Sequence, residues 1–114
     1  MTDGGRDQGR RDRLVRNEAL FREVNERVRD VGDRVAAETI DFLCECGDAS
    51  CTEPISLTRE DYEAVRSDPL LFAVKPRHEI LEVETVIAER HGFIVVRKHE
   101  NEGAIAKESD PRGD

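Results

Sequence analysis

Apolar residues recur at seven-residue intervals in the first third of the chain. The repeat consists of Leu14, Phe21, Val28 and Val35, with Asn17, Val24 and Val31 three residues after the first three. This a/d heptad pattern predicts a long amphipathic helix over residues 13–38. The helix would be roughly 39 Å long at 1.5 Å per residue. Gly32 weakens it by about 1 kcal/mol relative to alanine, and can end or bend it.

Two uses of this apolar stripe stay open. It can pack on the protein's own core, or it can form a seam with a protein partner or with a second copy in a homodimer. The length of the helix favours at least part of the stripe reaching a partner. The partner surface would consist of Leu14, Phe21, Val24, Val28, Val31 and Val35.

After residue 38 the pattern changes to short apolar runs separated by turn residues. Strands are predicted at residues 39–46, 53–57, 70–74 and 93–99. Pro54 lies near the start of the second strand, where no N–H is needed for pairing. Residues 82–90 can form either a short helix or the first strand of a hairpin that turns at His91-Gly92. Their density of valine, threonine and isoleucine favours the hairpin.

A second helix is predicted to begin at Thr58. Thr58 suits the N-cap position, Asp61 follows three residues later, and Leu57 and Tyr62 are spaced as a hydrophobic staple. Pro69 ends this helix at or before Asp68.

This order of elements predicts an α+β fold, with a long N-terminal amphipathic helix and a small, mainly antiparallel sheet with one short helix. We divide the chain into a disordered arm (1–12), the long helix (13–38), a small α+β zinc-binding domain (39–99) and a disordered tail (100–114). The arm and the tail are assigned to disorder because they contain few large apolar residues.

Charge limits the possible partners. The formal net charge of −8 opposes general binding to DNA or RNA, which requires a basic face. The local exception is an arginine-rich arm, which would have to carry any DNA-binding role; it consists of Arg6, Arg10, Arg11, Arg13 and Arg16. The chain has no apolar run near 18 residues and no signal-peptide pattern, which predicts a cytoplasmic protein without a membrane partner.

The strongest chemical signal is the segment CECGDASC, which holds every cysteine of the chain. Zinc takes four ligands in a tetrahedron, and thiolates suit it. On a regular strand Cys44 and Cys46 would face the same way, about 6.6 Å apart at their Cα atoms. A turn at Gly47-Asp48 would then bring Cys51 to the same ion. Glu45, Gly47 and Asp48 are poor neighbours for a buried apolar cluster, which favours a metal site.

Three thiolates require a fourth ligand. His78 is the best candidate because it follows Lys75-Pro76, where a rigid turn could present it. His91, His99, a carboxylate, a water or a group of a partner chain are the alternatives. An iron–sulfur cluster usually takes four cysteines and ranks behind zinc.

The spacing Cys-x-Cys-x4-Cys is similar to the post-SET zinc motif, in which three cysteines combine with a distant fourth ligand. This likeness covers eight residues and concerns coordination only. RNEALFREVNERV, FLCECGDASCTEPISLT, DYEAVRSDP and the segment 76–79 together resemble a family of small, uncharacterised actinobacterial proteins. That resemblance implies the same four positions, Cys44, Cys46, Cys51 and His78, and implies no activity.

These patterns predict a structural Cys3His zinc site in a small regulatory or protein-interaction module with no catalysis of its own. A closed site has no open position for water, and Glu79 beside His78 is the single candidate for a general acid or base. A zinc-thiolate redox sensor is the first alternative. A DNA-binding regulator that uses the arginine-rich arm is the second.

Overall fold

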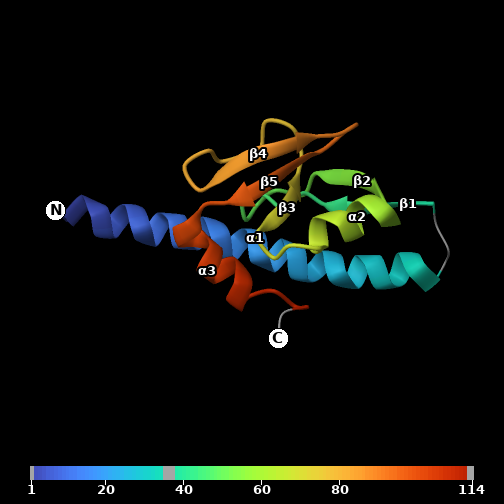
Figure 1. The fold of residues 1–114 in the computed structure, drawn as a ribbon, viewed down its shortest axis with the longest axis horizontal. Helices are drawn as coiled ribbons and strands as arrows, with labels where there is room; N and C mark the ends of the chain where they lie inside the picture. Colours follow the sequence, from blue (N-terminus) through green and yellow to red (C-terminus); the bar gives the residue numbers. More distant parts are fainter. Residues whose placement is uncertain (1, 35–37, 113–114) are drawn as a thin grey trace.

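The computed structural model describes residues 2–34 and 38–112 (Figure 1). Its elements are α1 (Thr2–Arg34), β1 (Thr39–Leu43), β2 (Pro54–Thr58), α2 (Arg59–Arg66), β3 (Leu71–Val74), β4 (Glu84–Glu89), β5 (Ile94–Lys98) and α3 (Glu100–Glu108). The predicted α+β fold is confirmed. None of the helices in these ranges is long and apolar enough to cross a membrane.

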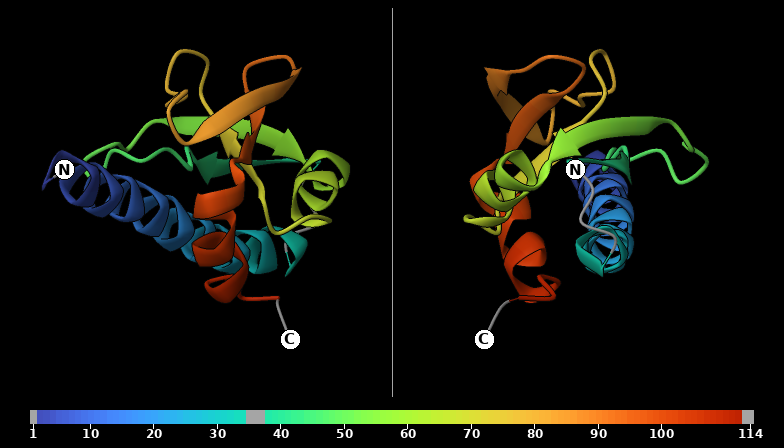
Figure 2. Two further views of the ribbon diagram at one scale, coloured as in Figure 1. Left: turned by 60° about the vertical axis from the view of Figure 1, so that its left-hand side comes forward. Right: turned by 90° about the vertical axis from the view of Figure 1, so that its right-hand side faces the viewer.

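The strands form two small antiparallel sheets. One is the pair β1-β2, and the other has the order β3-β5-β4. The backbone N–H of Glu45 donates to the carbonyl of Ala73 over 2.9 Å and thereby joins the segment after β1 to β3. Helix α1 runs along the body as one long rod, and α3 packs beside it (Figures 1 and 2).

The open choice at residues 82–90 is settled as a strand. β4 pairs with β5 in an antiparallel hairpin, with an irregularity between Val86 and Ala88. Gly92 has φ +90° in the turn, a conformation that favours glycine. The hairpin that the β-branched residues favoured is therefore the structure that forms.

The start of α2 follows the sequence prediction. Thr58 is the N-cap, and its side-chain oxygen accepts a hydrogen bond from the N–H of Asp61 over 3.1 Å. Leu57 and Tyr62 are both buried, as a staple requires. The Tyr62 ring stacks on Phe42 of β1 with the ring centroids 4.2 Å apart, which fixes α2 to the first sheet.

The two predicted disordered ends are helical instead. α1 begins at Thr2 rather than at residue 13, and Arg10 forms an ion pair with Glu82. Arginine, which occupies positions 6, 10 and 11 of this segment, is a good helix former. The described part of α1 runs to Arg34, and Glu38 is no longer helical; Val35 lies outside the described residues.

Residues Glu100–Glu108 of the predicted disordered tail (100–114) form the helix α3 instead. Ala106 is fully buried, and its carbonyl accepts a hydrogen bond from the Arg22 guanidinium over 2.6 Å. A side chain at Gly103 would meet Leu70, so this glycine lets α3 approach closely. α3 thus packs through small residues, whereas the prediction of disorder rested on the shortage of large apolar residues.

The face of α1 that enters the core carries polar as well as apolar residues. Glu18, Arg22 and Asn25 are buried, together with Val15 and Ala19. Within the heptad stripe, by contrast, Val31 is 58% exposed. Leu14 and Val28 of the same stripe do pack against the core. The stripe is therefore only partly a core contact, and the partner interpretation stays open.

The buried charges of α1 are matched from the second sheet. Lys98 of β5 lies between the carboxylates of Glu18 and Glu84, and all three side chains are fully buried. The ring of Phe72 contacts both Arg22 and Lys98, with 4.3 Å from the guanidinium carbon to the ring centroid. α1 is thus fixed by ion pairing and cation–π contact as well as by apolar packing.

Candidate metal centre

The cysteine segment continues from β1 and then turns sharply. The N–H of Cys44 donates to the carbonyl of Glu53 over 3.0 Å, which extends the β1-β2 pairing by one residue. Asp48 then closes the turn, since its carboxylate accepts from the N–H of Ser50 over 2.9 Å and its carbonyl accepts from the N–H of Cys51 over 3.0 Å. This Asx-type turn returns the chain so that Cys51 lies near the first two cysteines.

Helix α1 supports this loop. The side-chain amide of Asn17 donates to the carbonyl of Gly47 over 2.8 Å. A Cβ at Gly47 would lie 2.9 Å from Leu14 and 2.8 Å from Ile80. The loop is therefore packed between α1 and the segment that follows His78, with no room for a side chain at Gly47. Two members of the predicted heptad, Leu14 and Asn17, serve this contact.

A tight turn presents His78. The N–H of His78 donates to the carbonyl of Lys75 over 3.0 Å, and Arg77 has φ +75°. Proline in the second position and a positive φ in the third are the features of a type II turn. The rigid turn expected at Lys75-Pro76 is present, and it brings His78 to the cysteines.

The four candidate ligands converge. One ligand atom from each of Cys44, Cys46, Cys51 and His78 lies within 4.8 Å of the others. Nδ1 of His78 is 3.6 Å from Sγ of Cys44 and 3.6 Å from Sγ of Cys51. A tetrahedral zinc ion with Zn–S near 2.3 Å and Zn–N near 2.0–2.1 Å requires an S···N separation of about 3.6 Å. The donor set and its spacing therefore fit zinc.

Hydrogen bonding and burial shift the pKa values of the three thiols in different directions. The hydrogen bond between Cys44 and Cys46 raises the pKa of Cys44 and lowers the pKa of Cys46 to about 5. Burial raises the pKa of Cys51. The Lys75 N–H also donates to Sγ of Cys44 over 3.1 Å. A thiolate that binds a metal ion can accept the same hydrogen bond.

The other two histidines lie elsewhere. His99 is the N-cap residue of α3, and its Nε2 is 3.1 Å from Oγ1 of Thr85. His91 is exposed in the β4-β5 turn. Within the described ranges, His78 is the histidine that the fold groups with the cysteines.

The position of Glu45 differs from the one expected from the sequence. It was expected to be a poor core neighbour, yet it is fully buried. Its carboxylate accepts hydrogen bonds from the Asn25 side chain over 2.9 Å and from the N–H of Ala73 over 3.0 Å. Burial raises its pKa. An isolated sequence offers no sign of this, because both donors lie more than a dozen residues away.

A hollow of about 330 Å³ opens beside the cluster. It is lined by Cys46, Asp48, Arg77, His78, Glu79 and Ile80. One carboxylate oxygen of Glu79 is buried and has no hydrogen-bond partner among the described residues. The ion pair between Lys75 and Glu53, at 3.0 Å, ties the turn to the end of the cysteine loop. The side-chain contacts of Lys75 with Glu53 and of Asn17 with the carbonyl of Gly47 were not predicted, because the partners lie 22 and 30 residues apart along the chain.

Replacing Arg77 by glycine should stabilise the zinc-loaded protein by about 0.5–1 kcal/mol. The left-handed conformation costs a non-glycine residue about 1–2 kcal/mol, and the greater freedom of glycine in the unfolded chain offsets part of the gain. Urea unfolding at saturating zinc measures the change. Arg77→Ala is the matched control, because it removes the same side chain and keeps the unfavourable φ; a gain equal to that of Arg77→Gly would show that strain is not the cause.

No family model matches the chain, and no curated protein or solved structure matches it either. The likeness to a small actinobacterial family therefore stays a prediction.

Proposed function

We propose that this chain is a small protein-interaction module whose loop is held by a structural Cys3His zinc site. The observation that carries the proposal is the pair of 3.6 Å separations between His78 Nδ1 and the sulfurs of Cys44 and Cys51. They match what a tetrahedral zinc ion requires. A zinc ion bound there would supply folding free energy to a small domain.

A structural role is favoured over a catalytic one. Four protein ligands fill a tetrahedral zinc ion, so water has no open position from which to react. The three thiols are 1%, 2% and 9% exposed, for Cys44, Cys46 and Cys51 respectively. Glu79, the candidate acid or base, adjoins a centre that is already fully supplied with ligands. The proposal therefore includes no catalysis.

The interaction role is supported by α1. The zinc loop contacts this helix through Leu14 and Asn17, so a bound ion would fix the helix to the domain. Farther along, Val24, Val28 and Val31 line an apolar groove and are not fully covered by the protein itself. A rigid helix with a partly uncovered apolar stripe is a common form of protein contact surface.

The two alternatives receive less support. A redox sensor needs oxidant access to its thiolates, and here the cysteines are buried. A DNA-binding role needs a free basic arm, and Arg10 and Arg11 both lie within salt-bridge distance of Glu82. We rank the redox sensor second and DNA binding third.

Metal analysis tests the central step. Protein purified without added metal should contain about one zinc ion per chain, since one ion takes all four ligands. His78→Ala should lower the bound zinc, and His91→Ala, which alters an exposed histidine, should leave it unchanged. Wild-type protein that folds with no more than a trace of any transition metal would refute the zinc site.

A further inference from the structure

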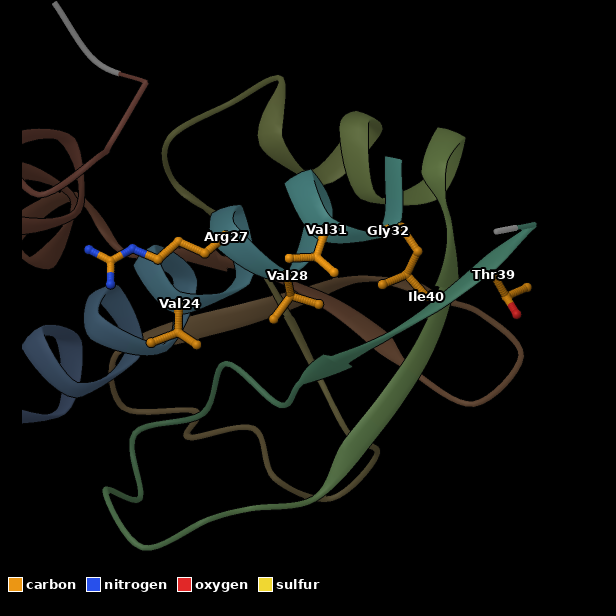
Figure 3. A pocket seen from close by; sticks show the side chains of 7 residues that line it. All are labelled: Val24, Arg27, Val28, Val31, Gly32, Thr39 and Ile40. Atoms are coloured by element: carbon orange, nitrogen blue, oxygen red, sulfur yellow. The ribbon is translucent and has the colours of Figure 1, made fainter. Parts of the chain in front are cut away.

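An apolar groove runs between the C-terminal half of α1 and β1. Its volume is about 420 Å³, and it is lined by Val24, Arg27, Val28, Val31, Gly32, Thr39 and Ile40. Figure 3 shows the valine side chains of α1 and the Ile40 side chain turned toward a common space. The groove therefore has an apolar wall from the helix and a second wall from the first strand of the small sheet.

Gly32 sets the width of this groove. A Cβ at this position would lie 2.4 Å from Cδ1 of Ile40, so the helix approaches β1 as closely as a glycine permits. Val28 and Val31 on the same stretch of helix are only partly covered. The stripe thus extends past the strand instead of lying fully on it.

The strand side of the groove is a free sheet edge. β1 pairs with β2 alone, with Leu43 opposite Pro54. Pro54 has no N–H to donate to Leu43. The N–H of the next residue, Cys44, points to β2. Because backbone groups alternate in direction along a strand, the N–H and C=O of Leu43 point away from β2. By the same alternation, those of Thr39 and Asp41 also point away from β2. Across residues 2–34 and 38–112, no hydrogen bond satisfies these four backbone groups of Thr39 and Asp41.

The protein itself closes the far end of this edge. The amide of Asn25 on α1 donates to the carbonyl of Leu43 over 2.8 Å and accepts from its N–H over 2.8 Å. A primary amide thus makes the pair of bonds that a neighbouring strand would make. Pairing therefore stops at Leu43, and the open part of the edge is confined to Thr39 and Asp41, beside the groove.

We propose that this edge and the groove bind an extended segment of a partner protein, which adds a third strand next to β1. This inference rests on the proposed interaction role and names its form. The next strand of a sheet lies about 4.8 Å from the edge. In that position its side chains on one face would enter the groove against Val24, Val28 and Val31, and its backbone would satisfy Thr39 and Asp41.

The chemistry of the partner follows from the two faces of β1. In an antiparallel addition, the residue opposite Ile40 faces α1 and should be β-branched and apolar. The residues opposite Thr39 and Asp41 lie on the exposed face beside the carboxylate of Asp41. The chain carries a net charge of −8 as well. The matching segment alternates valine or isoleucine with lysine or arginine.

A second copy of this chain fits the edge poorly. Two β1 strands paired at their edges would stand about 4.8 Å apart, with both α1 helices on the same face of the joined sheet. Helix axes need 8–10 Å between them. Because each α1 extends past its own β1, the two helices would compete for the same space. A strand without a helix of its own is therefore the favoured occupant.

A labelled peptide tests the inference on the zinc-loaded full chain. The probe is acetyl-Lys-Val-Lys-Val-Lys-Val-amide, followed by fluorescence anisotropy. We expect saturable binding that weakens on the order of tenfold when the lysine nitrogens are methylated, because those N–H groups face β1 and two hydrogen bonds are lost. Methylation of the valine nitrogens, which face away from β1, should leave the affinity within about twofold.

Protein variants locate the binding site. Val28→Asp should weaken binding on the order of tenfold or more, because it places a charge against an apolar side chain. Leu81→Asp is the matched control, since Leu81 is 66% exposed and lies outside the groove, and it should bind as the wild type does. Asp41→Lys should shift the preference to a peptide with glutamate in place of lysine.

Three results would overturn the strand inference: no binding of the peptide, equal sensitivity to methylation at lysine and valine, or no effect of Val28→Asp. If the peptide fails to bind and the wild type sediments as a dimer that Val28→Asp dissociates, the stripe serves self-association. In that case the proposed interaction role is retained, and the proposal that a partner adds a third strand is rejected. Absence of zinc from the folded wild type counts against the proposed function and leaves the peptide result to be judged separately.

Discussion

Removal of the proposed zinc ion should unfold much of this protein. Structural zinc sites contribute about 10–16 kcal/mol of apparent binding free energy, and a domain of this size has about 5–15 kcal/mol of total stability. A chelator should therefore lower the melting temperature by more than about 15 °C, since each kcal/mol shifts it by about 4–8 °C in small domains. Circular dichroism during thermal unfolding measures the effect.

The loss should begin at the cysteine loop. Without the ion, the thiols of Cys44, Cys46 and Cys51 lose their common partner, and the loop no longer holds Gly47 against Leu14 and Asn17. Cys44→Ser should reproduce the effect of the chelator, and His78→Ala should be milder if water replaces the imidazole. Added zinc should restore the melting temperature and added magnesium should not, because thiolates prefer the softer ion. An unchanged melting temperature after complete zinc removal would contradict the structural role.

Replacement of Lys98 by methionine should cost about 3–5 kcal/mol of stability. Removing one partner of a buried ion pair leaves the other charge uncompensated. Here the ammonium group lies between two fully buried carboxylates, those of Glu18 and Glu84, and it also contacts the Phe72 ring. Urea unfolding measures the change. The double variant Lys98→Met, Glu18→Gln should recover part of the loss, whereas a single-variant cost below about 1 kcal/mol would contradict the argument.

The same cluster gives stability a defined pH dependence. Burial raises the pKa of Glu18, and the nearby Glu84 raises it further. The charge of Lys98 lowers this pKa, but the net shift is upward. A raised folded-state pKa contributes stability that is complete below the unfolded value near 4.3 and is lost as the pH rises through the folded value. The stability of wild type minus that of Glu18→Gln should therefore fall with rising pH, by at most about 1.4 kcal/mol per unit. A constant difference would contradict the shift.

The sequence predicted the elements whose signals are local. Thr58 with Asp61 marked the start of α2, the β-branched residues of 82–90 favoured a hairpin over a helix capped by Gly92, and Lys75-Pro76 marked the turn that presents His78. The four candidate ligands were predicted for a similar reason. Cysteines spaced closely along the chain limit the geometry of a site before its surroundings are known.

What the sequence did not reveal depends on partners far along the chain. Glu18 and Arg22 look like surface residues until Lys98 and the carbonyl of Ala106 are placed next to them. Glu45 likewise requires Asn25 and Ala73. Hydropathy patterns rank each residue alone, so they assign such a polar face to solvent. The C-terminal helix was missed because short-range composition does not register close packing by small residues such as Gly103.

The buried polar residues of α1 also determine when this helix can dock on the rest of the protein during folding. The contact from Glu18 to Lys98 spans 80 residues, and the contact from Arg22 to Ala106 spans 84. During synthesis the helix leaves the ribosome early, and these partners leave it late. A helix with apolar residues inward could collapse onto the first strands, but buried charges have to wait for their counterions. We therefore expect α1 to dock in the last step of folding, so that its contacts govern the rate of unfolding more than the rate of folding.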